Sequence, residues 1–375
     1  MTLEQQVASL VTATTELTGV VNSELNSVRL ENNNFKTSTT ASLNAIVAER
    51  VRSGSFTIYV NPIGSSSPTN PINNISAPFN TIANAAVFLN SYYWTGEAII
   101  RLSPGIHLVN SSISISHTCL ITIAGASTPS LDGVNGIVSQ TTLANKDSSS
   151  SVAGSNLNLF DYLSSAFQSH IVVTTNTGWA FSLYDATFSI TNCFFYYQQK
   201  TNTGDPSQNN TGIHAGSGNS SPVLKLNNCA FMYFRYGIVN KSYCSLSLDG
   251  INVFSGNIDG IVNWEMASVM SAYSNSSVFC SGNTGSGISS TSSRYCYLSG
   301  VSSIANGLSG FSSYVNANYN IINGTSKNNG GYGYYVRDSG LIITSGSDTS
   351  TTGNALGKKY EQNSLQGFVV GISAT

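Results

Sequence analysis

Three carboxylates in the C-terminal half of the chain, Asp249, Asp259 and Glu265, are of the type that could break a glycosidic bond. Hydrolysis of that bond needs two carboxyl groups about 5 to 9.5 Å apart, on opposite sides of the sugar. Asp259 stands one residue before a glycine that recurs along the chain, Glu265 stands five residues after it, and Asp249 precedes Asp259 by ten. Parallel strands stack about 4.8 Å apart, so such residues can come close together. Solvated carboxylates in turns explain the same pattern, and the sequence leaves open whether the chain is an enzyme.

Aromatic residues are the second group that could contact a glycan, because sugar rings stack on aromatic faces. They are dense at residues 194–197 and 231–236, and half of each run must point outward in an alternating strand. The glycan-binding candidates are Tyr196, Tyr197, Tyr233, Tyr236 and Trp264. The polar segment 201–221 lies between the two runs, and protruding loops often carry recognition. Core filling or contact between subunits is the alternative role for each ring.

The composition argues against several other partners and ligands. The chain has 15 basic and 17 acidic residues, a net charge of −2, which gives no electrostatic basis for binding nucleic acid. No apolar stretch approaches the ~20 residues of a membrane span, so no membrane insertion is expected. The four histidines and six cysteines show no zinc-ligand spacing, so neither a metal nor any other cofactor is predicted. We expect no secretory signal at the N-terminus, and we expect buried thiols in a reducing compartment.

A glycine followed by a large apolar residue recurs through the second half of the chain. The pairs begin at Gly212, Gly237, Gly260, Gly287, Gly310 and Gly333, at intervals of 25, 23, 27, 23 and 23 residues. An Asn commonly stands three or four residues before the glycine, as at Asn257, Asn283, Asn306 and Asn329. Such a period is typical of a solenoid, in which each coil closes its core only against its neighbours. The sequence therefore predicts a mainly β fold, with a right-handed single-stranded parallel β-helix over residues 98–375. The glycines should form one column along it. The asparagines should lie at a corner of each coil, where they bond their own backbone or form a ladder between coils.

The N-terminal region has a different pattern. Residues 1–52 are predicted to be helical, with a heptad seam formed by Leu3, Val7, Leu10, Thr14, Leu17, Val21, Glu24 and Val28. A polar break at residues 31–40 separates this helix from a second one at 41–52. The seam predicts a coiled coil that holds the chain in a homotrimer, and the alternative is a helix that packs on the body of the protein. Residues 53–97 are predicted to hold a strand at 56–60 and one amphipathic helix near 79–89.

These three parts, in this order, resemble phage tailspike and tail-fibre proteins of the pectin-lyase-like parallel β-helix class. The resemblance rests on the N-terminal heptads, on residues 56–60 (FTIYV) and 78–85 (PFNTIANA), and on residues 99–105 (IIRLSPG). In that family the strand and helix cap the first coil and shield its open edge. Members are usually homotrimers on the virion that bind a bacterial surface glycan, and many also cleave it.

The resemblance implies a protein of the virion tail that is made in the cytoplasm of the host bacterium. Residues 1–52 would then bind other phage tail or virion proteins, and the β-helix body would bind the host surface glycan. Two functions remain. The one we favour is a structural or receptor-binding tail component without enzymatic activity. The alternative is a glycan depolymerase, a hydrolase or a lyase, on the same scaffold.

Overall fold

The computed structural model describes residues 1–116, 119–141, 153–175, 177–185, 187–199, 209–216, 222–271, 276–345, 351–361 and 368–370. The chain forms two compact units, Met1–Arg52 and Ser53–Thr375. Within these described ranges, no helix is both long and apolar enough to cross a membrane.

The first unit consists of the helix α1 (Leu3–Arg50), followed by β1 (Val51–Arg52). Thr2 caps the helix reciprocally with Gln5: the Thr2 hydroxyl accepts from the Gln5 amide at 3.3 Å, and the Gln5 side chain accepts from the Thr2 amide at 3.0 Å. The predicted break at residues 31–40 is wrong, because α1 runs through it without interruption. That segment contains Asn, Ser and Thr, which only weaken a helix, and neither Gly nor Pro, which would break it.

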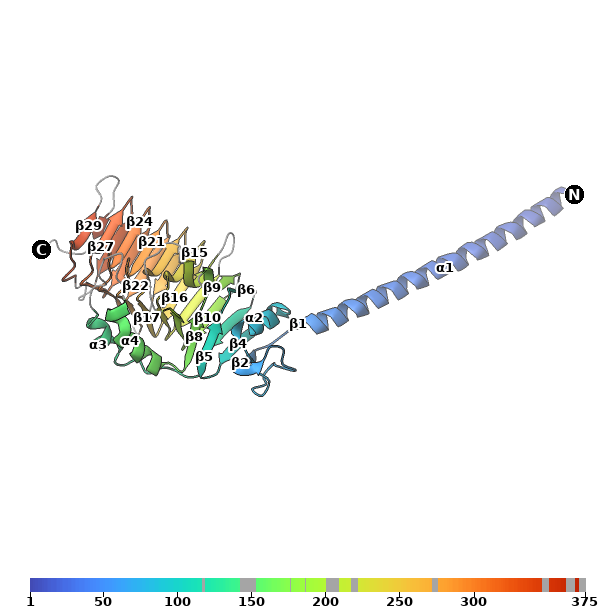
Figure 1. Cartoon of the computed structure of the whole chain (residues 1–375). Helices are drawn as coiled ribbons and strands as arrows, with labels where there is room; N and C mark the ends of the chain where they lie inside the picture. The colour runs from blue at the N-terminus through green and yellow to red at the C-terminus, as the bar shows by residue number, and fades with distance from the viewer. Residues whose placement is uncertain are drawn as a thin grey trace. The chain divides into compact units, whose positions relative to one another are not determined.

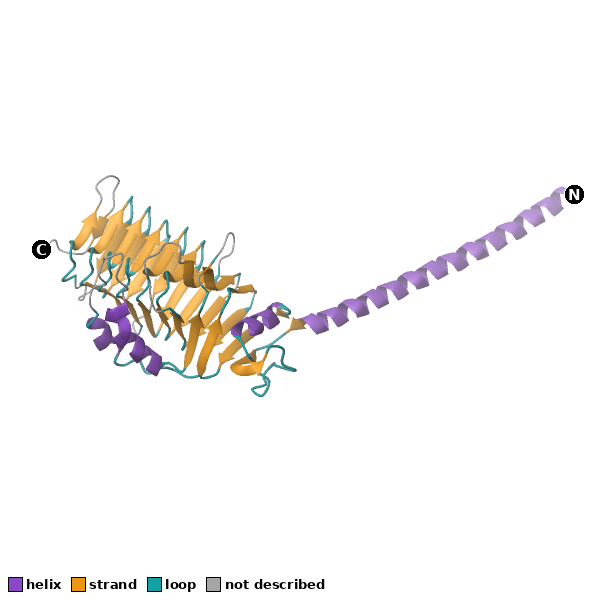
Figure 2. Ribbon diagram, in the orientation of Figure 1, coloured by secondary structure: helices purple, strands orange, loops and turns teal. Residues whose placement is uncertain are grey.

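The second unit is a stack of coils whose strands form three parallel sheets (Figure 1; Figure 2). Sheet 1 contains β2 (Phe56–Ser65), β4 (Glu97–Leu102), β7 (Leu120–Ala124), β10 (Thr187–Thr191), β13 (Val223–Asn227), β16 (Ser245–Asp249), β19 (Ser268–Ser271), β22 (Tyr295–Ser299), β25 (Asn318–Ile322), β28 (Leu341–Ser345) and β30 (Phe368–Val370). Sheet 2 contains β5 (Gly105–Val109), β8 (Ser169–Val173), β11 (Phe194–Tyr197), β14 (Ala230–Met232), β17 (Ile251–Ser255), β20 (Ser277–Ser281), β23 (Val301–Ile304) and β26 (Thr325–Lys327). Sheet 3 contains β6 (Ile113–Ser116), β9 (Thr177–Tyr184), β12 (Asn209–Ala215), β15 (Tyr236–Lys241), β18 (Asp259–Trp264), β21 (Ile288–Thr291), β24 (Phe311–Tyr314), β27 (Tyr332–Arg337) and β29 (Gly357–Glu361). Every third strand joins the same sheet, so the second unit is a parallel β-helix.

The predicted glycine column is confirmed by the register of sheet 3, where the residues that follow the glycines pair from coil to coil. The glycines are needed because the neighbouring coil leaves no room for a side chain. A β-carbon on Gly237 would lie 2.6 Å from the carbonyl oxygen of Gly260, and one on Gly260 would lie 2.6 Å from that of Gly287.

The predicted asparagines form a ladder between coils at the corner before this column. The backbone amide of Asn257 donates to the side-chain oxygen of Asn283 at 3.0 Å, Asn283 donates to Asn306 at 3.1 Å, and Asn306 to Asn329 at 2.9 Å. All four residues are buried. The ladder therefore satisfies the buried backbone amides of the corner, where no strand partner is available.

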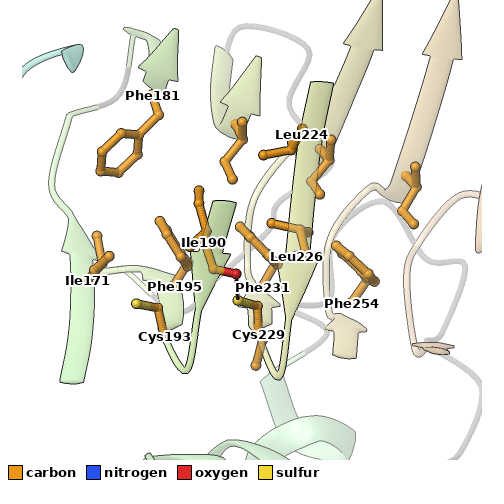
Figure 3. Packing of buried hydrophobic residues seen from close by; sticks show 14 of the residues in the cluster. Ile171, Phe181, Ile190, Cys193, Phe195, Leu224, Leu226, Cys229, Phe231 and Phe254 are labelled. Carbon is orange, nitrogen blue, oxygen red and sulfur yellow. Dashed lines mark hydrogen bonds between the residues drawn. The ribbon is translucent and has the colours of Figure 1, made fainter. Parts of the chain in front are cut away.

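The interior of the second unit is one apolar core built from repeated side chains. Phe195, Phe231 and Phe254 stack in successive coils, with ring centroids 4.6 and 5.3 Å apart (Figure 3). All six cysteines are free thiols and are buried in this stack. Burial raises the pKa of Cys229 and of Cys244 to about 12, which keeps both thiols protonated and unreactive.

In the described ranges of the second unit, three helices and one short strand accompany the coils. The predicted amphipathic helix is α2 (Ile82–Asn90), capped by Thr81, whose hydroxyl accepts from the Asn84 amide at 3.1 Å. The strand β3 (Tyr93–Trp94) follows it. Two further helices, α3 (Val134–Ser139) and α4 (Ala153–Ala166), are inserted between β7 and β8 and were not predicted from the sequence.

Candidate functional site

Three rows of side chains cover the outer face of sheet 3. Their positions are fixed relative to the glycine column: one residue before each glycine, two after it and four after it. The row one before contains Thr211, Tyr236, Asp259, Ser286, Ser309 and Tyr332; the row two after contains His214, Val239, Val262, Ser289, Ser312 and Tyr335; the row four after contains Gly216, Lys241, Trp264, Thr291, Tyr314 and Arg337. By strand alternation, the positions one and three after the glycine point into the core, where Ile261 and Asn263 of β18 are fully buried. Part of the outer rows is buried as well, namely Thr211, His214, Val239, Val262, Ser286, Ser309 and Ser312.

Aromatic side chains form a first group at the β9, β12, β15 and β18 end of this face. Tyr236 and Trp264 lie edge to face with ring centroids 5.8 Å apart, and the Arg235 guanidinium lies 5.1 Å from the Tyr236 ring. Trp179 stacks on His214 at 4.1 Å. Tyr236, Trp264 and Trp179 are each only partly buried, so each keeps some ring surface for a ligand. We call these three residues the first aromatic group.

A second aromatic group, Tyr314, Tyr332, Tyr335 and Tyr360, lies farther along the same face. Tyr335 and Tyr360 are stacked with centroids 4.9 Å apart, and Tyr332 lies 5.2 Å from Tyr360. Tyr314 lies 5.5 Å from Tyr335. All four rings are partly buried. None of these four tyrosines is among the five glycan-binding candidates, and counting outward from the glycine column places Tyr314, Tyr332 and Tyr335 on this face.

The charged side chains near this face lie beside partners of opposite charge. Lys241 and Glu265 form an ion pair at 3.1 Å, and Ser242 donates to Glu265 at 3.2 Å. Arg337 pairs with Asp338 at 3.0 Å. These exposed pairs stabilise the fold only weakly. Each of the two pairs has no net charge.

Asp259 and His214 are the two titratable groups of this face with strongly shifted pKa values. Desolvation raises the pKa of Asp259 to about 6, and the amide of Ser286 at 2.6 Å and the charge of Arg235 partly oppose the rise. Desolvation lowers the pKa of His214 to about 4, helped by Lys241 and opposed by Glu265. His214 is therefore neutral at pH 7, while Asp259 is close to its midpoint and mostly ionised.

The structure does not bring the three catalytic candidates together. Asp249 ends β16 in sheet 1, whereas Asp259 begins β18 in sheet 3 and Glu265 follows the same strand. β18 separates Asp259 from Glu265, and its extended backbone places the α-carbons of Asp259 and Trp264 about 17 Å apart. This distance far exceeds the ~5 to 9.5 Å that a glycosidase pair requires. Asp249, Asp259 and Glu265 therefore do not form a hydrolytic pair with one another.

Three of the five glycan-binding candidates lie in the interior of the protein. Tyr197 and Tyr233 are 1% and 2% exposed, and Tyr196 is 9% exposed. Phe160 of α4 covers Tyr196 and Tyr233, with ring centroids 5.0 and 5.8 Å apart. The prediction that these tyrosines point toward solvent is therefore wrong. The inserted helix α4 covers Tyr196 and Tyr233, whereas Tyr197 alternates with Tyr196 in β11 and belongs to the buried core. Only Tyr236 and Trp264 keep partly exposed rings.

The predicted recognition segment at residues 201–221 is only partly described. Its residues 209–215 form β12, in the middle of sheet 3. Residues 201–208 and 217–221 lie outside the described ranges.

A groove of about 440 Å³ lies between α3 and the outer face of sheet 2. Asp132 and Asn135 line it from the α3 side, and Ser277, Phe279 and Ser302 line it from the coils. Phe279 is 5% exposed, so the groove lacks an aromatic face for a sugar ring. No group of three or more His, Cys, Asp or Glu residues suited to a metal ion occurs in the described part of the chain.

Comparison with known proteins gives structural likeness only. No protein-family model matches the sequence, and no curated protein matches it. Among solved structures, a double mutant of the periplasmic alginate epimerase AlgG aligns with a TM-score of 0.36 and 12% identity over 75% of each chain. The Azotobacter vinelandii mannuronan C-5 epimerase AlgE4 A-module aligns with a TM-score of 0.34 and 10% identity, over 77% of this chain and 94% of that one. The catalytic domain of a GH87 α-1,3-glucanase in complex with nigerose aligns with a TM-score of 0.32 and 9% identity, over 78% of this chain and 66% of that one.

These likenesses are too low to argue for any activity. The three parallel sheets and their register define the class directly: residues 53–375 are a parallel β-helix protein that displays an aromatic and polar face on sheet 3.

Proposed function

We propose that this chain is a tailspike or tail-fibre component of a phage virion that attaches to a bacterial surface glycan through the outer face of sheet 3. The observation that carries the proposal is the pair of aromatic groups on that face, separated by hydroxyl side chains. Aromatic faces with a few polar groups beside them are the usual composition of a sugar-binding surface. We propose attachment without cleavage, since Asp249, Asp259 and Glu265 do not meet across a site.

The helix α1 supports a role in assembly. Its apolar side chains Leu3, Leu10, Leu17 and Val21 are 47% to 76% exposed in the single chain. The hydrophobic effect drives such a seam to find a partner, and the heptad spacing fits other copies of the same helix. We propose that residues 1–52 hold a homotrimer by a coiled coil and bind other tail or virion proteins. Synthesis in the cytoplasm of the host bacterium agrees with the six free cysteines.

A glycan depolymerase on the same scaffold is the second candidate function, and Asp259 is the residue that favours it. A carboxyl group with a pKa of about 6 can act as a general acid near neutral pH. In this case the reaction would be a β-elimination: a tyrosine of the same face would remove the ring proton, Asp259 would protonate the leaving oxygen, and Arg235 would bind the carboxylate of the substrate.

Binding of purified bacterial capsular and lipopolysaccharide glycans to the full chain tests the first proposal. We expect retention of at least one glycan, about tenfold weaker affinity for Trp264→Ala, and no release of reducing or unsaturated ends. Tyr297→Ala is the matched control, because Tyr297 is a partly buried tyrosine on the outer face of sheet 1. Failure to retain any glycan would reject the glycan-binding role. New chain ends that Asp259→Asn abolishes would establish the depolymerase instead.

A further inference from the structure

The stretch between the two aromatic groups contains only small side chains. In the row four after the glycines, Trp264 pairs with Thr291 and Thr291 with Tyr314. In the row that lies two residues after the glycines, Val262 is followed by Ser289, Ser312 and Tyr335 in successive coils. At a strand spacing of about 4.8 Å, Trp264 and Tyr314 stand about 10 Å apart, two coils from one another. The two aromatic groups can therefore contact different sugar residues of a single ligand.

Hydroxyl side chains lie in and beside this stretch. Ser286 and Ser312 share a hydrogen bond at 2.9 Å but are only 3% and 1% exposed, so the hydroxyls open to a ligand are those of Ser289 and Thr291. Both of these residues are partly exposed. Hydroxyl side chains both donate and accept, so they match the hydroxyls of a sugar without requiring a charge.

The charges on and beside this face indicate which glycans it would accept. Lys241 pairs with Glu265, Arg337 pairs with Asp338, and the positive charge of Arg235 acts on Asp259. In β29, Lys359 pairs with Glu361 at 3.3 Å. A polyanionic glycan would bring its carboxylates or phosphates next to Glu265, Asp338, Glu361 and Asp259, so repulsion by these carboxylates would oppose its attraction to the cations beside them. A neutral glycan is not repelled by these carboxylates, so the arrangement of charges does not weaken its binding.

We propose, on the basis of the glycan-binding function proposed above, that the two aromatic groups are two subsites of one site for a neutral oligosaccharide. One sugar residue packs on Trp264 and Tyr236, another packs on Tyr335 and Tyr314, and the part between them crosses Ser289. The ligand class is a glycan without carboxylate or phosphate groups.

The experiment measures binding of the full chain to immobilised bacterial polysaccharides, half of them neutral and half bearing uronic acid or phosphate. Ser289→Trp places a large ring between the two subsites, and we expect it to weaken binding at least tenfold. Ser247→Trp is the matched control, because Ser247 is also a partly exposed serine at the centre of a strand, on the outer face of sheet 1. Thr291→Trp repeats the block at a second position, in case Ser289→Trp does not fold.

The expected result is retention of neutral polysaccharides, with an affinity that changes little with salt concentration. Trp264→Ala and Tyr335→Ala should each weaken binding of the same polysaccharide about five- to tenfold. Salt-sensitive binding of anionic polysaccharides only, or full binding by both tryptophan-insertion variants, would overturn this assignment and leave glycan attachment itself standing. If the unaltered chain retains no polysaccharide of either kind, glycan attachment and this assignment both fail.

Discussion

Replacement of Asn306 by alanine tests the asparagine ladder most directly. The Asn306 side chain is fully buried and bonds in two directions. Its oxygen accepts from the backbone amide of Asn283 at 3.1 Å and from the Asn283 side chain at 2.8 Å. Its nitrogen has three acceptors within reach: the Ser303 hydroxyl at 2.9 Å, the Asn329 oxygen at 3.0 Å and the Cys280 carbonyl at 3.1 Å.

The size of the effect follows from the partners that Asn306→Ala would leave behind. The Asn283 side chain keeps its bond to the Phe254 carbonyl, and the Ser303 hydroxyl keeps its bond to the Gly310 carbonyl. The backbone amide of Asn283 loses the acceptor at the corner, and a buried donor without a partner costs about 1–3 kcal/mol. The lost side-chain volume adds a small cavity. We therefore expect Asn306→Ala to lower the free energy of unfolding by about 2–4 kcal/mol.

Denaturant unfolding followed by circular dichroism at a fixed protein concentration measures this loss. Asn318→Ala is the matched control, because Asn318 is a partly buried asparagine at the start of β25, for which a change within about 0.5 kcal/mol is expected. Equal shifts of the denaturation midpoint for Asn306→Ala and Asn318→Ala would refute the claim that the ladder stabilises the corner.

Three further predictions follow from other features. Gly260→Ala should destabilise the β-helix by about 1–3 kcal/mol, because its β-carbon meets a carbonyl oxygen at 2.6 Å, whereas Gly136→Ala, with no atom within 4 Å, should be neutral or stabilising in thermal melts. The pKa of Asp259 is raised from 3.8 to about 6, so the free energy of unfolding falls as the pH rises through that interval. Asp259→Asn should therefore raise the free energy of unfolding at pH 7 by at most about 3 kcal/mol and give no gain below pH 3. An equal gain at pH 3 and pH 7 would contradict this explanation. Removal of residues 1–52 should convert the proposed trimer to a monomer in light scattering without loss of the β-strand signal, and an unchanged mass would show that the trimer depends on the β-helix instead.

The β-helix could be predicted from the sequence because the constraint repeats. A glycine is required wherever the next coil's carbonyl fills the space of a side chain, so Gly237, Gly260 and Gly287 recur at the coil period. The asparagines recur with them because each bonds the next, as Asn283 bonds Asn306. Steric and hydrogen-bonding requirements of this kind select the same residue type in each repeat. The period is therefore visible in the sequence even when the contacting residues are not known.

The candidate site could be predicted only in part because it depends on single, non-repeated contacts. Tyr196 and Tyr233 are buried because Phe160 of α4 packs against them. The pattern of the β-strands does not predict that a helix is inserted at this place. Asp259 and Glu265 are separated because Asp259 begins β18 and Glu265 follows the end of that strand. Register within a coil, more than the period between coils, decides which side chains meet.

The six cysteines have a consequence for measuring how the stack opens. They lie one per coil in six successive coils: Cys119 before β7, Cys193 before β11, Cys229 before β14, Cys244 before β16, Cys280 in β20 and Cys296 in β22. Each thiol is shielded from solvent as long as its own coil stays closed. A thiol reagent with variants that retain one cysteine each would therefore time the exposure of each coil separately, and so show from which end the β-helix unzips.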